Sequence, residues 1–112
     1  MIVTSDPVVA ARHLAPALKA MGDENRLAIL LTLVNGPRSV IELTTLLGIG
    51  QTLVSHHLKV LRDIGLVSAT AVGRSNVYEF CCDAVAAPVR QLAGLAGMSV
   101  DPVPTPCARI GA

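Results

Sequence analysis

The side chains best suited to chemistry lie close together between residues 51 and 62, in the stretch QTLVSHHLKVLR. They are all hydrogen-bonding or basic groups: Gln51, Thr52, Ser55, His56, Lys59 and Arg62. Such groups hydrogen-bond to base edges and phosphates in nucleic acids. Two adjacent histidines in the same stretch also suggest three other roles, which are metal binding, catalysis and packing.

The two histidines point in different directions if residues 51–64 form a helix. At about 100° per residue, His57 falls in an apolar arc with Leu53, Val54, Leu58, Val60, Leu61 and Ile64. His56 falls among the polar side chains. Metal ligands on one helix need a spacing of three or four residues, so this pair does not form a metal site. We expect His57 to be partly buried with a hydrogen-bond partner and His56 to face solvent or DNA.

Catalysis is not expected from this stretch. Ser55 neighbours His56, but the sequence places no acid that would orient the histidine as a base. The chain also lacks paired carboxylates and a glycine-rich phosphate-binding loop. The sequence therefore does not predict an enzyme.

Two short helices joined by a glycine turn would position the polar residues. Ser39 and Glu42 match a capping box that opens a helix, residues 48–50 form a Gly-Ile-Gly turn, and the next helix ends at Gly65. This order is typical of a helix-turn-helix, with residues 51–64 as its second helix. In a DNA major groove, Gln51, Thr52, Ser55 and His56 would reach bases, while Lys59 and Arg62 would reach phosphates.

A β-hairpin follows this unit. Hydrophobicity alternates with a period of two before and after the segment VGRSN, which predicts two strands with residues 73–76 at the tip. A hairpin after a helix-turn-helix is a wing. Its polar tip residues Arg74, Ser75 and Asn76 are suited to an adjacent minor groove.

Helices are also predicted on both sides of the winged unit. The segment 7–20 should be broken at Pro16, the segment 23–35 is apolar enough to be largely buried, and a last helix should begin properly near Pro88. The fold class is therefore mainly α with a small β-hairpin, a winged helix-turn-helix. We expect one DNA-binding and dimerisation domain over residues 1–97 and a flexible proline-rich tail over residues 98–112.

Composition limits the function classes. The 112 residues suit one domain and 52% of them are apolar, with a net charge of only +1, so any basic surface must be local. The sequence shows neither a leader pattern nor an apolar stretch long enough for a membrane span, which predicts a cytoplasmic protein. Three cysteines, two of them adjacent, argue against a disulfide framework.

The chain resembles the ArsR/SmtB family of winged-helix repressors over residues 14–96. The likeness lies in the segments DENRLAILLTL, SVIELTTLLGIGQTLVSHHLKVLRDIGLV and GRSNVYEF. It implies a homodimer that pairs through its first and last helices and presents two second helices to a palindromic double-stranded operator. It also implies repression that an inducer, often a metal ion, relieves. The last helix supports a dimer independently, because its apolar residues Val85, Val89, Leu92 and Leu95 are unsuited to exposure.

The metal sites common in that family are not matched here. Residues 42–47 contain no Cys-x-Cys, and Asp83 is not followed by the expected histidines. The remaining candidates are Cys81, Cys82, Cys107 and His13, either as ligands of a soft or divalent ion or, for the cysteines, as a redox pair or simply buried small side chains. The ligands and the inducer stay open.

The sequence thus predicts a sequence-specific DNA-binding transcriptional regulator, a repressor released or modulated by a metal ion or another small effector. One alternative is a winged-helix module that binds protein and no DNA, against which Lys59, Arg62 and Arg74 argue. A second alternative is a thiol-responsive regulator that uses Cys81 and Cys82.

Overall fold

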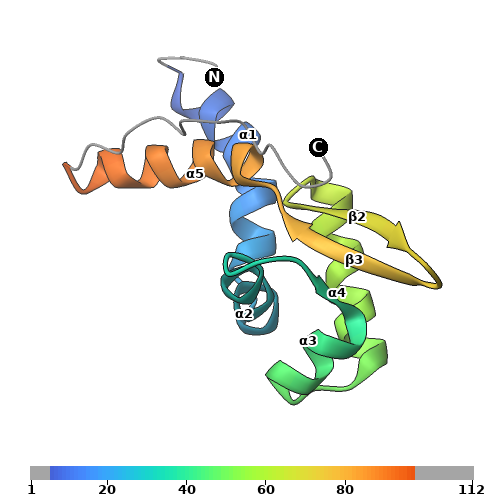
Figure 1. Ribbon diagram of the computed structural model, residues 1–112. Helices are drawn as coiled ribbons and strands as arrows, with labels where there is room; N and C mark the ends of the chain where they lie inside the picture. The colour runs from blue at the N-terminus through green and yellow to red at the C-terminus, as the bar shows by residue number, and fades with distance from the viewer. Residues whose placement is uncertain (1–5, 98–112) are drawn as a thin grey trace.

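The computed structural model describes residues 6–97, except for the side chains of residues 82–85 and 87. Its elements follow the order α1 (Pro7–Met21), α2 (Glu24–Leu33), β1 (Arg38–Ser39), α3 (Val40–Leu47), α4 (Gln51–Ile64), β2 (Val67–Val72), β3 (Ser75–Phe80) and α5 (Cys82–Leu95) (Figure 1). This confirms the predicted fold class, mainly helical with a small hairpin.

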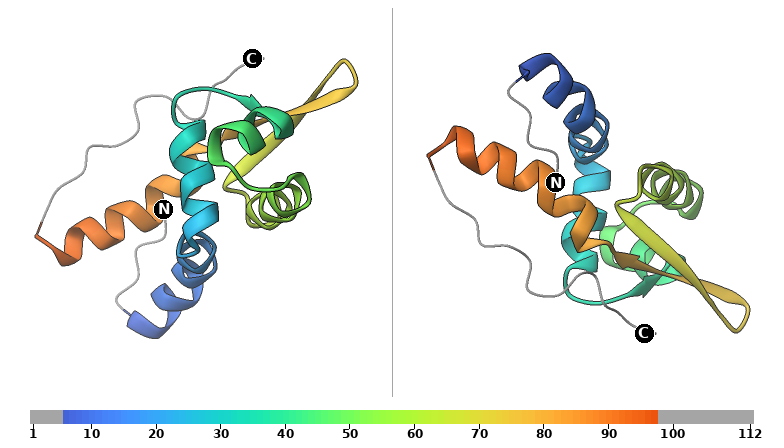
Figure 2. Two further views of the ribbon diagram at one scale, coloured as in Figure 1. Left: turned by 90° about the horizontal axis from the view of Figure 1, so that it is seen from below. Right: turned by 90° about the horizontal axis from the view of Figure 1, so that it is seen from above.

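Helix α5 and the β2–β3 hairpin project to opposite sides of the molecule. The three views in Figures 1 and 2 agree on this arrangement, with α1–α4 lying between the two projections. The hairpin and the α3–α4 pair therefore lie away from the free end of α5.

None of the helices within residues 6–97 has both the length and the hydropathy needed to span a membrane.

Polar caps fix where the first three helices begin. The side chain of Asp6 accepts the Val8 N–H at 2.9 Å, and that of Asp23 accepts the Arg26 N–H at 3.0 Å. At α3 the predicted capping box is confirmed: Ser39 N–H donates to Glu42 Oε1 at 2.8 Å, and Glu42 N–H donates to Ser39 Oγ at 3.2 Å. These bonds satisfy N–H groups that the first helical turn leaves unpaired.

The sheet has three antiparallel strands in the order β1-β3-β2. Val67 pairs with Phe80 and Val72 with Ser75, so the loop contains only Gly73 and Arg74. Gly73 has a φ of 62°, the left-handed value that a two-residue hairpin turn requires. The predicted tip of residues 73–76 was therefore too long, because Ser75 and Asn76 already belong to β3.

The core lies where α1–α4 meet the base of the hairpin. Its members come from α1, α2, α3, α4, β2, β3 and the residue before β2: Ala20, Ile29, Leu30, Leu33, Leu43, Val54, Leu58, Leu61, Leu66, Val67 and Tyr78. Helix α2 is buried on one side only. Leu27, Leu31 and Val34 are 43%, 62% and 60% exposed, so the prediction that this helix is largely buried was wrong. Its apolar composition does not specify which faces the rest of the chain covers.

Two prolines lie inside continuous helices, contrary to prediction. Pro16 does not break α1, and α5 begins at Cys82 rather than near Pro88. An internal proline removes one N–H and typically costs about 3 kcal/mol or more. Contacts of α1 with α2, α4 and α5 offset this cost at Pro16, and Pro88 is itself buried. Packing has outweighed the local penalty in both helices.

Candidate nucleic-acid interface

Helix α4 has a buried apolar face and an exposed polar face. Val54, His57, Leu58 and Leu61 are buried at helical spacing. The polar residues predicted for DNA binding are all exposed on this helix: Gln51, Thr52, Ser55, His56, Lys59 and Arg62. Leu53 and Ile64, which the helical pattern places on one side of the apolar arc, are 42% and 39% exposed and do not belong to the core.

Tight bonding at its C-terminal end fixes the length of α4. Gly65 has a φ of 92°, its N–H donates to Arg62 O at 3.0 Å, and the N–H of Leu66 donates to Leu61 O at 2.9 Å. These bonds form a Schellman motif, and Leu61 and Leu66, at the positions that usually make an apolar contact in this motif, are both fully buried in the core. The end of α4 is thereby fastened to the core just before β2.

The N-terminal end of α4 is different. Its N-cap is Gly50, and no side chain caps it, whereas side chains cap α1, α2 and α3. Gly48 ends α3 in the left-handed conformation with a φ of 70°. The chain thus turns sharply between α3 and α4 and leaves the first turn of α4 accessible, where Gln51 and Thr52 lie.

One basic group on the polar face is paired within its own helix. Lys59 Nζ lies 3.0 Å from Asp63 Oδ2, and both side chains are more than half exposed. Exposed pairs at this spacing contribute little to stability. Asp63 therefore matters here mainly because it places a negative charge beside a residue predicted to contact phosphate.

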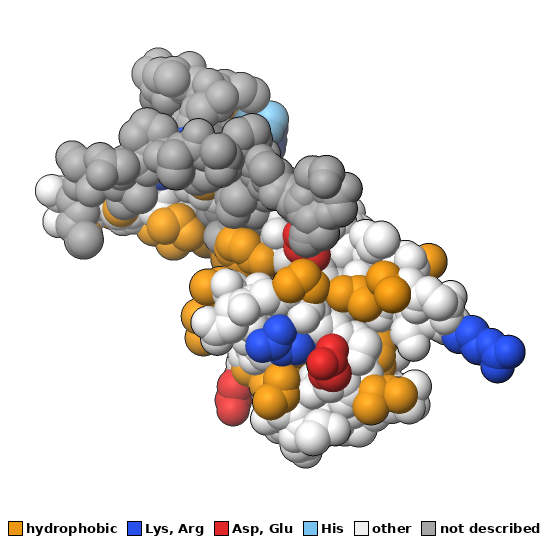
Figure 3. All heavy atoms as spheres, viewed as in Figure 1, with side chains coloured by type: hydrophobic (Ala, Val, Ile, Leu, Met, Phe, Trp, Pro, Cys, Tyr) orange, Lys and Arg blue, Asp and Glu red, His pale blue; other side chains and the backbone are white. Residues whose placement is uncertain are grey.

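The hairpin adds a second exposed basic position. Arg74 lies in the two-residue loop, Ser75 and Asn76 begin β3, and all three are exposed. Figure 3 shows a basic side chain at the outer end of the hairpin, separated from the body of the molecule. The hairpin thus provides the extended polar tip that a wing requires.

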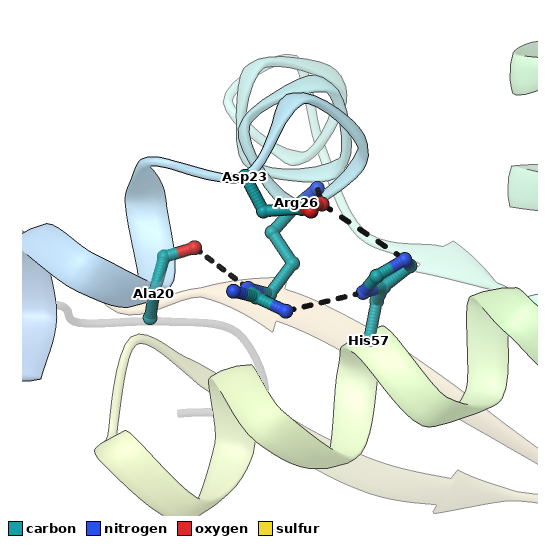
Figure 4. Close-up of polar contacts among 4 residues, drawn as sticks. All are labelled: Ala20, Asp23, Arg26 and His57. Atoms are coloured by element: carbon teal, nitrogen blue, oxygen red, sulfur yellow. Dashed lines mark hydrogen bonds and ion pairs between the residues drawn. The ribbon is translucent and has the colours of Figure 1, made fainter.

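His57 is held by residues of α2 and its N-cap (Figure 4). Its Nδ1 lies 3.4 Å from Nη1 of Arg26, and its Nε2 lies 3.9 Å from Oδ2 of Asp23. The same arginine donates through Nε to the carbonyl oxygen of Ala20 at 2.7 Å. These contacts join α4 to the junction between α1 and α2, and they confirm the predicted burial of His57, which is 6% exposed.

The contact with Arg26 determines the favoured form of His57. A guanidinium only donates hydrogen bonds, so Nδ1 must accept, and the neutral ring then has its proton on Nε2. Burial lowers the pKa of His57 below its ordinary value of 6.5, and the Arg26 charge and His56 lower it further, while Asp23 opposes them. The pKa of Asp23 is also lowered, chiefly because its carboxylate accepts the Arg26 N–H.

The sequence did not predict these partners of His57. Neither Asp23 nor Arg26 was singled out as a partner of His57. Asp23 and Arg26 lie more than thirty residues before His57, so helical periodicity cannot reveal the contact. The available signal was an arginine within the apolar segment NRLAILL.

The candidate metal and thiol residues do not come together in the described part of the chain. Cys81 is partly buried at the N-cap of α5, and His13 is exposed on α1. The side chain of Cys82, and Cys107 with the predicted tail, lie outside the described residues. Within the described range, no three His, Cys, Asp or Glu side chains are grouped as metal ligands would be.

Comparisons of the chain with known proteins agree on one family of regulatory proteins. Residues 23–69, which span α2 to the start of β2, match the model of bacterial regulatory proteins of the arsR family. The chain is 46% identical over 69 residues to the HTH-type transcriptional regulator NmtR of Mycobacterium tuberculosis, covering 62% of this chain and 58% of NmtR. It is 41% identical over 61 residues to the repressor SmtB of strain H37Rv, covering 54% of this chain and 45% of SmtB. The chain thus spans about half the length of these two relatives.

A third relative is matched over more of its own length. The transcriptional activator HlyU of Vibrio cholerae is 37% identical over 75 residues, which cover 67% of this chain and 69% of HlyU. The solved structure of reduced HlyU superimposes with a TM-score of 0.68 and 33% identity, covering 79% of this chain and 93% of that one. Similarity therefore extends beyond the helix-turn-helix to most of the fold.

Proposed function

Because this chain belongs to the ArsR family of bacterial regulatory proteins, we propose that it is a sequence-specific DNA-binding transcriptional regulator. Members of this family bind DNA and typically act as dimers. Residues 1–97 would form the DNA-binding and dimerisation domain, and the protein would act in the cytoplasm.

The observation that supports this proposal best is the division of α4 into two faces. One face packs into the core through Val54, Leu58 and Leu61, which fixes the helix rigidly. The opposite face is accessible along its whole length and ends in basic residues. A helix anchored in this way suits insertion into a DNA major groove.

The position of each polar residue along α4 suggests its role. Gln51, Thr52, Ser55 and His56 lie in the first two turns and would contact base edges. Lys59 and Arg62 lie nearer the C-terminal end and would contact phosphates, and Arg74 and Ser75 of the hairpin would contact the neighbouring minor groove. Only the phosphate contacts of Lys59 and Arg62 would be insensitive to sequence.

A homodimer would supply two such helices to a palindromic operator. Helix α5 exposes Val89, Leu92 and Leu95, which are 42%, 46% and 85% accessible, and α1 exposes Val8 and Val9. Apolar groups gathered on two helices favour association. Pairing through α1 and α5 would leave α4 and the hairpin free for half-sites about 34–36 Å apart.

For the mode of action we propose repression that a small effector modulates. SmtB is named a repressor and HlyU an activator, so relatives of this chain regulate in both directions. A transcription reaction on the chain's own promoter would separate the two modes, because a repressor lowers the transcript yield and an activator raises it.

DNA binding is tested directly by fluorescence anisotropy. The reduced protein would be titrated into labelled DNA from its own upstream promoter and into scrambled DNA at several salt concentrations, with nickel, zinc, cobalt and arsenite added in turn. We expect tighter binding to the promoter than to scrambled DNA, with an affinity that falls steeply as salt increases. Equal and weak binding to both DNAs would favour the alternative, a winged-helix module that binds protein.

A further inference from the structure

A groove of about 530 Å³ lies where α1 and α2 meet α4. Its lining residues are of two kinds, three cations and five apolar side chains: Arg12, Lys19 and Arg26, and Ala15, Pro16, Ala20, Val60 and Ile64. A volume of this size is typical of sites for small organic molecules. We propose that this groove binds a small organic anion with an apolar body, such as an aliphatic or aromatic carboxylate.

The charge of the groove selects an anion. Among the side chains that the structure describes, no acidic residue lines the groove, and no ion pair involves Arg12, Lys19 or Arg26. Arg12 and Lys19 are exposed about two turns apart on α1 and can turn toward a ligand without disturbing the core. A carboxylate would form charge-assisted hydrogen bonds with them.

The apolar part of the lining selects the body of the ligand. Ala15, Pro16 and Ala20 of α1 form one wall, and Val60 and Ile64 of α4 form the other. An inorganic anion would leave these walls wet, whereas a hydrocarbon chain or ring would cover them and gain the free energy of apolar burial.

The groove is directly connected to the helix that we propose for DNA recognition. Val60 and Ile64, which line the groove, belong to α4. Arg26 of α2, which also lines it, contacts His57 of α4 (Figure 4). An anion that draws the Arg26 guanidinium toward itself would weaken its contact with Nδ1 of His57. Ligand binding would then change the position of α4 and with it the affinity for DNA, a consequence that depends on the proposed function.

The ligand-binding experiment needs no DNA. The probe is 8-anilinonaphthalene-1-sulfonate, which is fluorescent when bound, with octanoate and octanol as competitors of equal chain length. We expect saturable binding, displacement by octanoate, and little displacement by octanol. The double variant Arg12→Gln/Lys19→Gln should bind the probe and octanoate at least about tenfold more weakly, since it loses two charge-assisted hydrogen bonds to the anion.

Arg38→Gln provides the matched control, because Arg38 is a partly exposed cation on β1 that does not line the groove. The proposal is overturned if the double variant binds as the unchanged protein does, or if octanol competes as well as octanoate. Circular dichroism checks that the variants are folded, which is expected because both substituted side chains are exposed.

The regulatory consequence has a separate measurement. Anisotropy with promoter DNA, with and without saturating octanoate, should show a change in affinity of about fivefold or more, the usual size of allosteric coupling. Octanoate that binds in the groove without altering DNA affinity would overturn the regulatory role. If the protein binds no DNA at all, the proposed function fails, and the probe titration still decides whether the groove binds anions.

Discussion

The guanidinium of Arg26 lies 3.4 Å from Nδ1 of His57, so a residue of α2 contacts the buried side of α4 directly behind its polar face. His57 is bounded by Asp23 on its other nitrogen and by the His56 ring, whose centroid is 5.7 Å away. The contact requires an unprotonated Nδ1. One polar contact between α2 and α4 therefore depends on the charge of His57.

We expect the free energy of unfolding to fall as the pH drops below about 6.5. The pKa of His57 is lower in the folded chain than its ordinary value of 6.5, so the unfolded chain takes up this proton first. The resulting stability is fully present above pH 6.5 and is lost as the pH falls through the folded pKa. Urea unfolding at several pH values between 7.5 and 5 measures this loss.

His57→Gln is the matched variant for that measurement. Glutamine retains a side-chain acceptor for Arg26 but does not titrate. The variant should lose most of the pH dependence between 7 and 5, whereas His56→Gln, at an exposed position, should retain it. Identical pH profiles for His57→Gln and the unchanged protein would contradict the assignment.

Arg62→Ala and Gln51→Ala should affect DNA binding in different ways. Removing a phosphate contact weakens binding to every sequence and reduces the salt slope by about one. Removing a base contact mainly reduces the preference for promoter over scrambled DNA, by about 1–3 kcal/mol. Anisotropy with both DNAs at four salt concentrations distinguishes these effects. If neither variant changed the affinity, the placement of α4 on DNA would be wrong.

Asp63→Asn should strengthen DNA binding without regard to sequence. Asp63 holds Lys59 at 3.0 Å and adds a negative charge to the surface proposed to meet phosphates. Its neutralisation frees Lys59, so the affinity for promoter and scrambled DNA should rise together and become more sensitive to salt. The control is Glu24→Gln, because Glu24 is an exposed acid on α2, and this variant should leave the affinity for DNA unchanged. Glu42→Gln is unsuitable as a control because Glu42 belongs to the capping box of α3.

Features determined by neighbouring residues were predicted well from the sequence. The capping box of Ser39 and Glu42 and the left-handed cap at Gly65 depend on residues within one or two turns, and the structure confirms both. Burial of His57 followed from helical periodicity. The DNA-contacting roles of the α4 and hairpin residues remain predictions, although their exposure agrees with them.

Features determined by distant residues were predicted poorly. Pro16 and Pro88 have a local penalty, and only packing against other helices shows that the helices continue through them. β1 has two residues, too few to show alternation. The contact of Arg26 with His57 and the groove beside it depend on how α1 and α2 meet α4, and a single sequence gives no signal for that arrangement.

The two glycines that flank α4 should respond oppositely to substitution. Gly65 has a φ of 92° with open space around the missing Cβ, so Gly65→Ala should destabilise the fold by about 1–2 kcal/mol through backbone strain alone. Gly50 has a φ of −68° and also has open space, and Gly50→Ser would add the cap that α4 lacks, stabilising the fold by about 0.5 kcal/mol. Thermal unfolding should therefore show a lower Tm for the first variant and a slightly higher Tm for the second, with Gly50→Ala as a control that lacks the hydroxyl. A higher Tm for Gly65→Ala would mean that the left-handed cap does not fix the end of α4, and with it the anchoring of the polar face would be in question.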